Sequence, residues 1–417
     1  MTLLYSEVEE ELRAAVRALL ADRRPPSAVL ARAESAPGHD ADLWKALARD
    51  IGAAGLLIPE DLGGAGASAR EAAVVLEELG RAVAPVPFLT SAVMATGALV
   101  ASGAGEARDL LASLATGEST AALAVSFAAS PYPPGPAWVR AERGRLTGRV
   151  TAVAGAEGAD VLVVPASGAL YAVDAADAVV EPVTSLDLTR PVATVTFDGA
   201  PGRPVAAGLA PLRAGLALGA GLLASEQLGV AEWCLATTLA YVKERHQFAR
   251  PVGSFQALKH RLADLWMEIV QARAAARNAA DALATRAGAG DDRPTRPQVT
   301  GPGAAGAAEA AGQDGRAHDQ AVEAMEAMEA MEAVDTGEAV DAEVAMAVAV
   351  AQAWCGPVAV HAAEECLQLH GGIGMTWEHP LHLYLKRAKA DQIALGTPGD
   401  HRDALARLAD LPAPLAV

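Results

Sequence analysis

The chain has few cysteines and no motif that would use them to hold a metal. Only Cys234, Cys355 and Cys366 occur in 417 residues, each in an apolar helix-like context and none at the spacing of a zinc or iron–sulfur site. Free cysteines in such contexts are usually buried, and reduced thiols are typical of a reducing compartment. The sequence therefore predicts buried free thiols and no metal site.

Positive charge is scarce as well. Lys and Arg total 33 against 51 Asp and Glu, which gives a net charge of -18. Nucleic acid and anionic membrane surfaces repel such a chain unless it carries a local basic patch. We therefore expect no nucleic acid and no membrane among its partners.

The first residues lack the basic segment and apolar core of a signal peptide. They read Met-Thr-Leu-Leu-Tyr-Ser-Glu, and no uninterrupted apolar run elsewhere reaches membrane-spanning length. On this pattern we expect a cytoplasmic protein.

Length and periodicity divide the chain into three parts. A chain of 417 residues with 52% hydrophobic content exceeds the usual single domain. Helical patterns fill residues 1–118, where Ser6 and Glu9 resemble a capping box, and return over residues 209–417. Short β-rich runs separated by Gly, Pro and Asp predict a small antiparallel β domain over residues 119–208. The runs are Ala122–Phe127, Trp138–Ala141, Arg145–Ala154, Val161–Pro165, Leu170–Val173 and Val192–Phe197.

Residues 286–341 break this scheme. They are rich in Gly, Pro and Asp and then repeat Glu-Ala-Met. A three-residue period does not keep Met on one face of a helix, which weighs against a partner-binding Met stripe. We interpret the segment as a solvated, partly disordered insertion between two C-terminal helices.

Residues 244–264 join two segments with helical periodicity. Pro251 and Gly253 break the pattern, and Ser254 is placed to cap a second helix. Local physics alone predicts a helix–turn–helix corner, with Arg245 and Gln247 near the junction.

Two blocks of sequence resemble the acyl-CoA dehydrogenase family. Residues 245–256 read Arg-His-Gln-Phe-Ala-Arg-Pro-Val-Gly-Ser-Phe-Gln and resemble its flavin-binding signature; residues 368–380, which begin Gln-Leu-His-Gly-Gly-Ile-Gly, resemble its Gln-x-x-Gly-Gly-x-Gly segment. The resemblance implies an α+β fold with an N-terminal helical domain, a middle antiparallel β domain and a C-terminal four-helix-bundle-like domain. It also implies FAD-dependent α,β-dehydrogenation of a CoA thioester.

The same resemblance implies which residues contact FAD. Arg245 would pair with the pyrophosphate, where bidentate geometry favours Arg, and the glycines would permit close backbone approach near the adenosine. In the family's dimers these two blocks reach the neighbour's FAD. The structural alternatives are a solvated arginine at a helix end, a core phenylalanine and a helix C-cap. The assigned residues are Arg245, Gln247, Phe248, Gln256, Gln368, Gly371, Gly372 and Thr397.

The catalytic base of the family has no counterpart. Removing the proton α to a thioester needs a carboxylate, which in the family is a glutamate at one of two positions. Leu395 stands at the first position, and Gly219 stands at the second, followed by Ala220 where an arginine is usual. The resemblance therefore leaves this chain with no catalytic residue.

Three acids near these helices could serve instead. Glu226, Asp391 and Asp400 lie in or near the relevant segments, although each is more simply a solvated or helix-end carboxylate. A self-sufficient enzyme with such a displaced base is thus one alternative. An inert binding or scaffold protein that keeps the fold is another.

The chain's own flavin contacts are also altered. Residues 152–154, Ala-Val-Ala, stand where the family has Trp-x-Thr, and residues 126–128, Ser-Phe-Ala, replace Thr-Glu-Pro. Groups that serve a neighbour's cofactor are retained and groups that serve the chain's own are lost. This pattern resembles non-catalytic subunits of heteromeric actinobacterial acyl-CoA dehydrogenases that act on bulky CoA thioesters such as steroid side chains. It implies an acyl-CoA substrate, a homologous catalytic subunit in a heterotetramer or homo-oligomer, and electron-transfer flavoprotein as partners.

Overall fold

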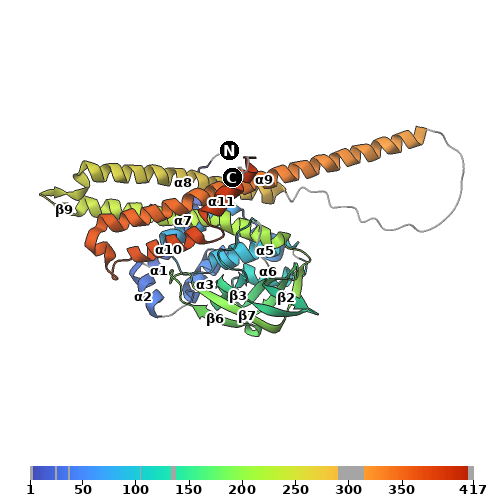
Figure 1. The fold of residues 1–417 in the computed structure, drawn as a ribbon, viewed down its shortest axis with the longest axis horizontal. Coiled ribbons are helices and arrows are strands. Elements are labelled where there is room, and N and C mark those ends of the chain that lie inside the picture. Colours follow the sequence, from blue (N-terminus) through green and yellow to red (C-terminus); the bar gives the residue numbers. More distant parts are fainter. Residues whose placement is uncertain are drawn as a thin grey trace, which may run out of the picture.

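The computed structural model describes residues 3–23, 26–35, 38–103, 105–132, 138–289 and 314–411. A first set of helices is followed by one sheet and then by a second set of long helices, which is the predicted three-part order (Figure 1). Long helices lie side by side along one edge of the molecule, and the sheet lies on the opposite side of the N-terminal helices.

The N-terminal set is built from short helices. The first begins where the sequence predicts, because Ser6 N–H donates to the Glu9 carboxylate and Glu9 N–H donates to Ser6 Oγ, which confirms the capping box. The elements are α1 (Glu7–Arg23), α2 (Pro26–Ser35), α3 (Ala41–Asp50), η1 (Ala53–Gly55), η2 (Glu60–Leu62), α4 (Ala69–Arg81), π-helical η3 (Phe88–Ala95), α5 (Thr96–Ala101) and α6 (Arg108–Ala115).

The middle sheet follows the order β6-β7-β3-β2-β4-β5-β8, with β1 beside β4. Most neighbouring strands are antiparallel, while β1 and β2 each run parallel to β4. The two strands without a predicted run are β6 and β8. The strands are β1 (Ala121–Leu123), β2 (Val139–Glu142), β3 (Arg145–Ala154), β4 (Val161–Ala166), β5 (Ala169–Asp174), β6 (Val179–Val183), β7 (Val192–Pro201) and β8 (Arg203–Ala206).

The C-terminal set contains the longest helices. Its elements are α7 (Ala210–Glu244), α8 (Gln256–Ala289), α9 (Asp314–His370), η7 (Gly371–Met375), α10 (Leu381–Ile393) and α11 (Pro398–Leu408). A hairpin of β9 (His246–Gln247) and β10 (Arg250–Pro251) turns the chain between α7 and α8 at one far end of the molecule (Figure 1).

Two segments, Ala210–Glu244 and Ala342–Met375, are long and apolar enough to cross a bilayer by length and composition. Within their most apolar windows, 83% and 67% of the residues are buried inside the fold. Helices that are apolar all round are typical of a protein core, so packing in the bundle accounts for this composition.

The start of α8 differs from the prediction. Ser254 does not cap it, because the turn Val252–Ser254 intervenes and the helix starts at Gln256. The carbonyl of Phe255 accepts the first helical bonds, from Leu258 N–H and Lys259 N–H. Ser254 Oγ is buried without a hydrogen-bond partner in the described structure.

The predicted insertion at residues 286–341 falls largely outside the described residues. Residues 290–313 are not described, and residues 314–341 are described only as backbone of α9. Its interpretation as a solvated, partly disordered segment stays a prediction.

Candidate active site and cofactor surface

The two positions at which the resemblance places a catalytic base lie side by side. A Cβ built on Gly219 of α7 would lie 3.2 Å from Leu395 Cδ1 and 2.6 Å from Met94 Cγ. Met94 belongs to η3, and both it and Leu395 are buried. The structure thus brings the two positions to one place, and the side chains that meet there are aliphatic or thioether groups.

Leu395 is also linked by its backbone, through Phe127, to strand β3 of the sheet. Its N–H donates to the Phe127 carbonyl at 2.7 Å, and Phe127 N–H donates to the Ala152 carbonyl at 2.8 Å. Leu395 and Ala152 both have φ of 55°, a left-handed conformation that is unfavourable outside glycine. The segments that the resemblance assigns to the chain's own flavin therefore do meet, through direct backbone hydrogen bonds.

A buried ionic network lies next to this contact. Arg190 donates to Asp391 Oδ1 at 2.5 Å and to both Glu226 carboxylate oxygens at 2.6 Å. Arg387 of α10 donates to Asp187 Oδ2 at 2.5 Å and also to Glu226. The network joins the loop before β7 to α7 and α10, because Asp187 and Arg190 come from that loop.

The network contains two guanidinium groups and three carboxyl groups. Because the carboxyl groups outnumber the cations, one of them is favoured in its neutral form. Burial, and then the nearby Glu226 charge, raises the pKa of Asp391 to about 8. Burial opposes the ionisation of Glu226 too, but the guanidinium groups of Arg190 and Arg387 outweigh it and lower the pKa of Glu226. Glu226 is thus an ionised partner of two arginines and Asp391 is mostly protonated at neutral pH. Neither is placed to accept a substrate proton.

The third candidate acid, Asp400, takes part in the N-terminal cap of helix α11. Thr397 Oγ1 donates to Asp400 Oδ2 at 2.8 Å, and Asp400 N–H donates to Thr397 Oγ1 at 3.2 Å. This capping box begins α11 and lowers the pKa of Asp400 through its hydrogen bonds with the Thr397 backbone and side chain. The Thr397 hydroxyl, which the resemblance assigns to FAD, is therefore engaged in capping.

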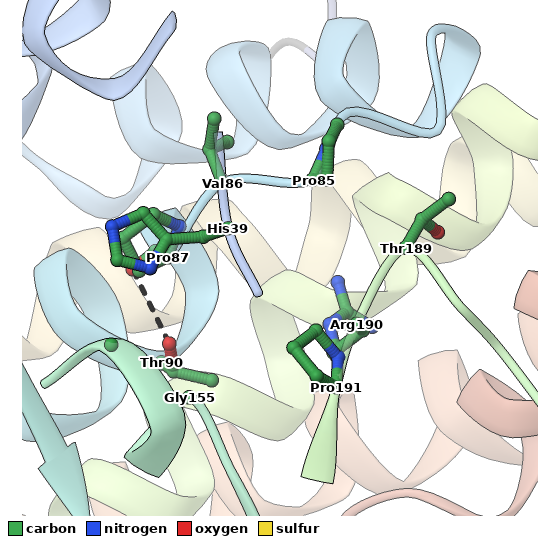
Figure 2. A pocket seen from close by; sticks show the side chains of 10 residues that line it. His39, Pro85, Val86, Pro87, Thr90, Gly155, Thr189, Arg190 and Pro191 are labelled. Carbon is green, nitrogen blue, oxygen red and sulfur yellow. Dashed lines mark hydrogen bonds between the residues drawn. The ribbon is translucent and has the colours of Figure 1, made fainter. Parts of the chain in front are cut away.

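A small cavity lies beside the network (Figure 2). His39, the Pro85–Thr90 segment, Gly155 and Arg190 approach it from separate parts of the chain. Its volume is about 20 Å³, which suits a single water molecule and no substrate. Burial lowers the pKa of His39, so its imidazole is neutral at the wall of this cavity.

The cofactor residues of the first block lie at the opposite end of α7. Arg245 is the residue at which α7 ends, and its side chain is exposed with no carboxylate partner in the described chain. Gln247 and Gln256 are exposed, and Phe248 at the hairpin tip is 86% exposed, so the alternative of a core phenylalanine is wrong. Arg250 lies over the Phe255 ring at 3.9 Å.

The second block reaches the same end of the molecule. The ring of Tyr241, one turn before Arg245, stacks on His370 at a centroid distance of 4.3 Å, and its hydroxyl donates to the His370 carbonyl. Gln368, Gly371 and Gly372 are exposed beside this contact. Gly371 has φ of 61° and no atom within 4 Å of a built Cβ, which fits both a helix C-cap and close approach of a ligand.

The hairpin and the helix ends beside it are rich in basic residues although the chain is acidic, and one of these residues, Arg261, is paired with Glu365 of α9. Residues 243–261 contain Lys243, Arg245, Arg250, Lys259 and Arg261 but only one acid, Glu244. An exposed basic surface with open glycines fits a dinucleotide's phosphates. The residues at the chain's own flavin position fit a flavin ring poorly, because Ala152, Val153, Ala154 and Phe127 carry no polar side-chain group and Ser126 alone among residues 126–128 and 152–154 keeps a hydroxyl. Sequence reasoning missed Arg190, Arg387 and Met94, since no local pattern marks them.

Family models match most of the chain. The model "Acyl-CoA dehydrogenase, N-terminal domain" matches residues 6–118, and "Acyl-CoA dehydrogenase, C-terminal domain" matches residues 206–299 and 307–409.

A curated relative is similar over nearly the whole length. The acyl-CoA dehydrogenase IpdE2 of Mycobacterium tuberculosis is 35% identical over 402 residues, which cover 96% of each protein. Two solved structures are also similar over nearly the whole chain. The ChsE4-ChsE5 complex from Mycobacterium tuberculosis is 27% identical with a TM-score of 0.76, covering 99% of this chain and 100% of that one. A variant of the steroid ACAD Tcur3481-Tcur3483 is 28% identical with a TM-score of 0.73, covering 98% and 99%.

Proposed function

Because the chain belongs to the acyl-CoA dehydrogenase family, we propose that it is the non-catalytic chain of a heteromeric acyl-CoA dehydrogenase and completes the FAD site of a catalytic partner chain. The observation that carries the proposal is the convergence of Gly219 and Leu395 on Met94. Both of the family's base positions face one place, and no carboxylate stands at either of them.

The chain's own flavin contacts support the same proposal. Phe127 and Ala152 are hydrogen-bonded to each other through their backbones, and Phe127 is likewise bonded to Leu395. A flavin ring needs hydrogen-bond partners for its polar edge, and a buried polar edge without them costs free energy. The side chains of residues 152–154 supply none.

The opposite end of α7 supplies the residues for a partner's cofactor. FAD bound in the catalytic chain would supply the hydride acceptor for α,β-dehydrogenation. Arg245 would neutralise pyrophosphate charge, with Gln247 and Gln256 on the same wall. Gln368 and the open backbone at Gly371 would lie along the adenosine.

Two named relatives support the substrate class and the assembly. One similar structure is a steroid ACAD and another is a complex of two different chains. We propose a bulky CoA thioester, such as a steroid side chain, as the substrate of the assembly. Electron-transfer flavoprotein as electron acceptor and a cytoplasmic location belong to the same proposal.

Two alternative functions have less structural support. A displaced base would have to be Glu226, Asp391 or Asp400, and the first two lie in the buried network while the third caps α11. A scaffold function through residues 286–341 rests on a segment that is largely outside the described structure.

Counting flavin tests the proposal. The chain should be purified alone and after co-expression with a homologous catalytic chain, and FAD per chain and turnover of an acyl-CoA measured. We expect little FAD and no turnover alone, with both restored in the complex. One FAD per chain and full turnover by the isolated chain would overturn the proposal.

An arginine substitution locates the contact. Arg245→Ala should reduce FAD retention by the complex about tenfold, the value of one charged hydrogen-bonded contact. Its melting temperature should not change, because the side chain is exposed. Arg149→Ala is the matched control, since Arg149 is an exposed arginine on the sheet. Equal FAD retention by both variants would exclude Arg245 from the site.

A further inference from the structure

An apolar pocket lies between α7 and α8, beside the β9–β10 hairpin that joins these two helices (Figure 1). Its volume is about 420 Å³, whereas the cavity beside the ionic network has a volume of about 20 Å³. Sites for small organic ligands typically measure about 300–1,000 Å³. The pocket is therefore large enough to hold a small molecule.

Each helix presents one apolar face to this pocket. On α7, Leu235, Leu239 and Val242 recur at helical spacing, and on α8, Leu262 and Trp266 do the same. Leu235, Val242 and Leu262 are buried, whereas Trp266 is 55% exposed. The pocket thus has an apolar floor and opens to solvent beside the indole ring. An exposed apolar hollow of this kind is typical of a binding site.

The backbone of the turn closes the pocket at the hairpin end. Pro251 and Gly253 line it there. A Cβ built on Gly253 would lie 3.0 Å from the Val242 carbonyl oxygen, so a larger residue would push the turn away from α7. The close approach holds the wall in place before any ligand arrives, which reduces the ordering cost of binding.

Two lysines are the charged residues that line the pocket. Lys243 comes from α7 and Lys259 from α8, and both are exposed. Neither side chain has an ion-pair or hydrogen-bond partner in the described chain, and no acidic residue lines the pocket. The pocket therefore combines an apolar interior with two unpaired positive charges, in a chain whose net charge is -18.

We propose that this pocket binds a small amphipathic carboxylate. The apolar body of the ligand lies against Leu239, Leu262 and Trp266, and its carboxylate is held by Lys243 and Lys259.

The chemistry of the lining selects this class of ligand. Apart from the two lysines, the indole N–H of Trp266 is the one polar side-chain group among the lining residues. A sugar or a nucleotide would lose water from many polar groups and find few partners, which costs free energy. An apolar body gains by leaving water, and a single anionic group satisfies both ammonium groups.

The pocket is separate from the sites described above. None of its lining residues belongs to the set assigned to FAD. Gly219, at the position of the family's catalytic base, lies 16 residues before Leu235 on α7, which is about 24 Å at the rise of an α-helix. The proposal therefore does not depend on the assignment of a catalytic partner.

Calorimetric titration of the full-length chain tests the class of ligand. The probe is dodecanoate below its micellar concentration, and the comparison probe is dodecyltrimethylammonium, which has the same alkyl chain and a positive head. We expect saturable binding of one dodecanoate and weaker binding of the cation. Nonspecific adsorption to an acidic chain would favour the cation, so equal or stronger binding of the cation would overturn the proposal.

A substitution that fills the pocket tests its location. Ala263 is an exposed lining residue on α8, so Ala263→Trp should fold normally and abolish dodecanoate binding. Ala274→Trp is the matched control, since Ala274 is an exposed alanine of the same helix outside the pocket. Unchanged binding by Ala263→Trp would place the ligand elsewhere. A change of oligomeric state in Ala263→Trp, without dodecanoate binding by the unaltered chain, would show a protein interface instead and also overturn the proposal.

A charge substitution provides a second variant that leaves the pocket's shape nearly unchanged. Lys243→Gln combined with Lys259→Gln should weaken dodecanoate binding about tenfold, the value of two exposed ion pairs. Lys45→Gln is the control, because Lys45 is an exposed lysine of α3. Equal affinity in the double variant and the control would refute the role of the two lysines.

Discussion

Replacing Asp391 by asparagine changes the pH dependence of stability in a way that the buried network predicts. Asp391 Oδ1 accepts from Arg190, while Oδ2 is buried without a partner in the described structure. An asparagine keeps an oxygen for Arg190 and cannot ionise. The variant therefore resembles the protonated form of Asp391.

The magnitude follows from the raised pKa. The pKa of Asp391 is about 8 in the folded protein, against an ordinary value of about 4 in the unfolded chain. Between these values the folded state binds one more proton than the unfolded state, so the stability contribution of Asp391 is greatest below pH 4 and is lost as pH rises towards 8. Over this range the free energy of unfolding falls by at most about 1.4 kcal/mol per pH unit because of Asp391.

The assay is urea unfolding at pH 5.5, 6.5 and 7.5 for both proteins. The free energy of unfolding of Asp391→Asn, minus that of the unaltered chain, should rise by about 3 kcal/mol over this range. Because the two free energies of unfolding are subtracted at each pH, the contributions of groups whose titration the substitution leaves unchanged cancel.

A difference that stays constant with pH would refute the reasoning, because it would mean that Asp391 is ionised in the folded protein. Glu226→Gln is the contrasting variant. It leaves Arg190 and Arg387 with less compensating charge and should cost about 3–5 kcal/mol at pH 5.5. The cost should fall at higher pH, because loss of the Glu226 charge lowers the pKa of Asp391 and allows Asp391 to ionise beside the arginines.

Three further predictions concern packing and capping. Gly229→Ala should lower the free energy of unfolding by about 1–3 kcal/mol, since a Cβ there would lie 2.0 Å from the Glu77 carbonyl oxygen where α7 crosses α4; unaltered urea unfolding would contradict this close approach. Thr397→Ala should cost about 1 kcal/mol by removing its bonds with Asp400. Ser254→Ala should change stability by less than about 0.5 kcal/mol, because its hydroxyl has no described partner. Equal losses in thermal melts of these two variants would contradict the assignment of the caps.

Much of the fold could be predicted from local signals. The Ser6 and Glu9 capping box depends on neighbouring residues, and the three-part order follows from a change of hydrophobic period. Strand β6 could not be found in this way, because it is largely exposed and has no apolar alternation. Ser254 was misjudged because a short turn separates it from α8, and residue type alone does not reveal such a turn.

The candidate site was only partly predictable for a different reason. Leu395 and Gly219 could be located by motif position, but their contact through Met94 depends on how η3, α7 and the end of α10 pack. The ionic network joins Asp187 to Arg387, 200 positions away, so no spacing rule could indicate it. Residues separated in this way become partners only through the tertiary fold.

Helix α7 carries Gly219, which packs against Met94 and Leu395, towards one end and leads into the basic hairpin at the other end. Gly219 and Arg245 are 26 residues apart on it, which at the rise of an α-helix is about 39 Å. Substitutions at one end therefore have no shared contact with the other. During evolution a chain could therefore lose its own active site by drift, while selection preserved the remote surface that a catalytic partner chain needs.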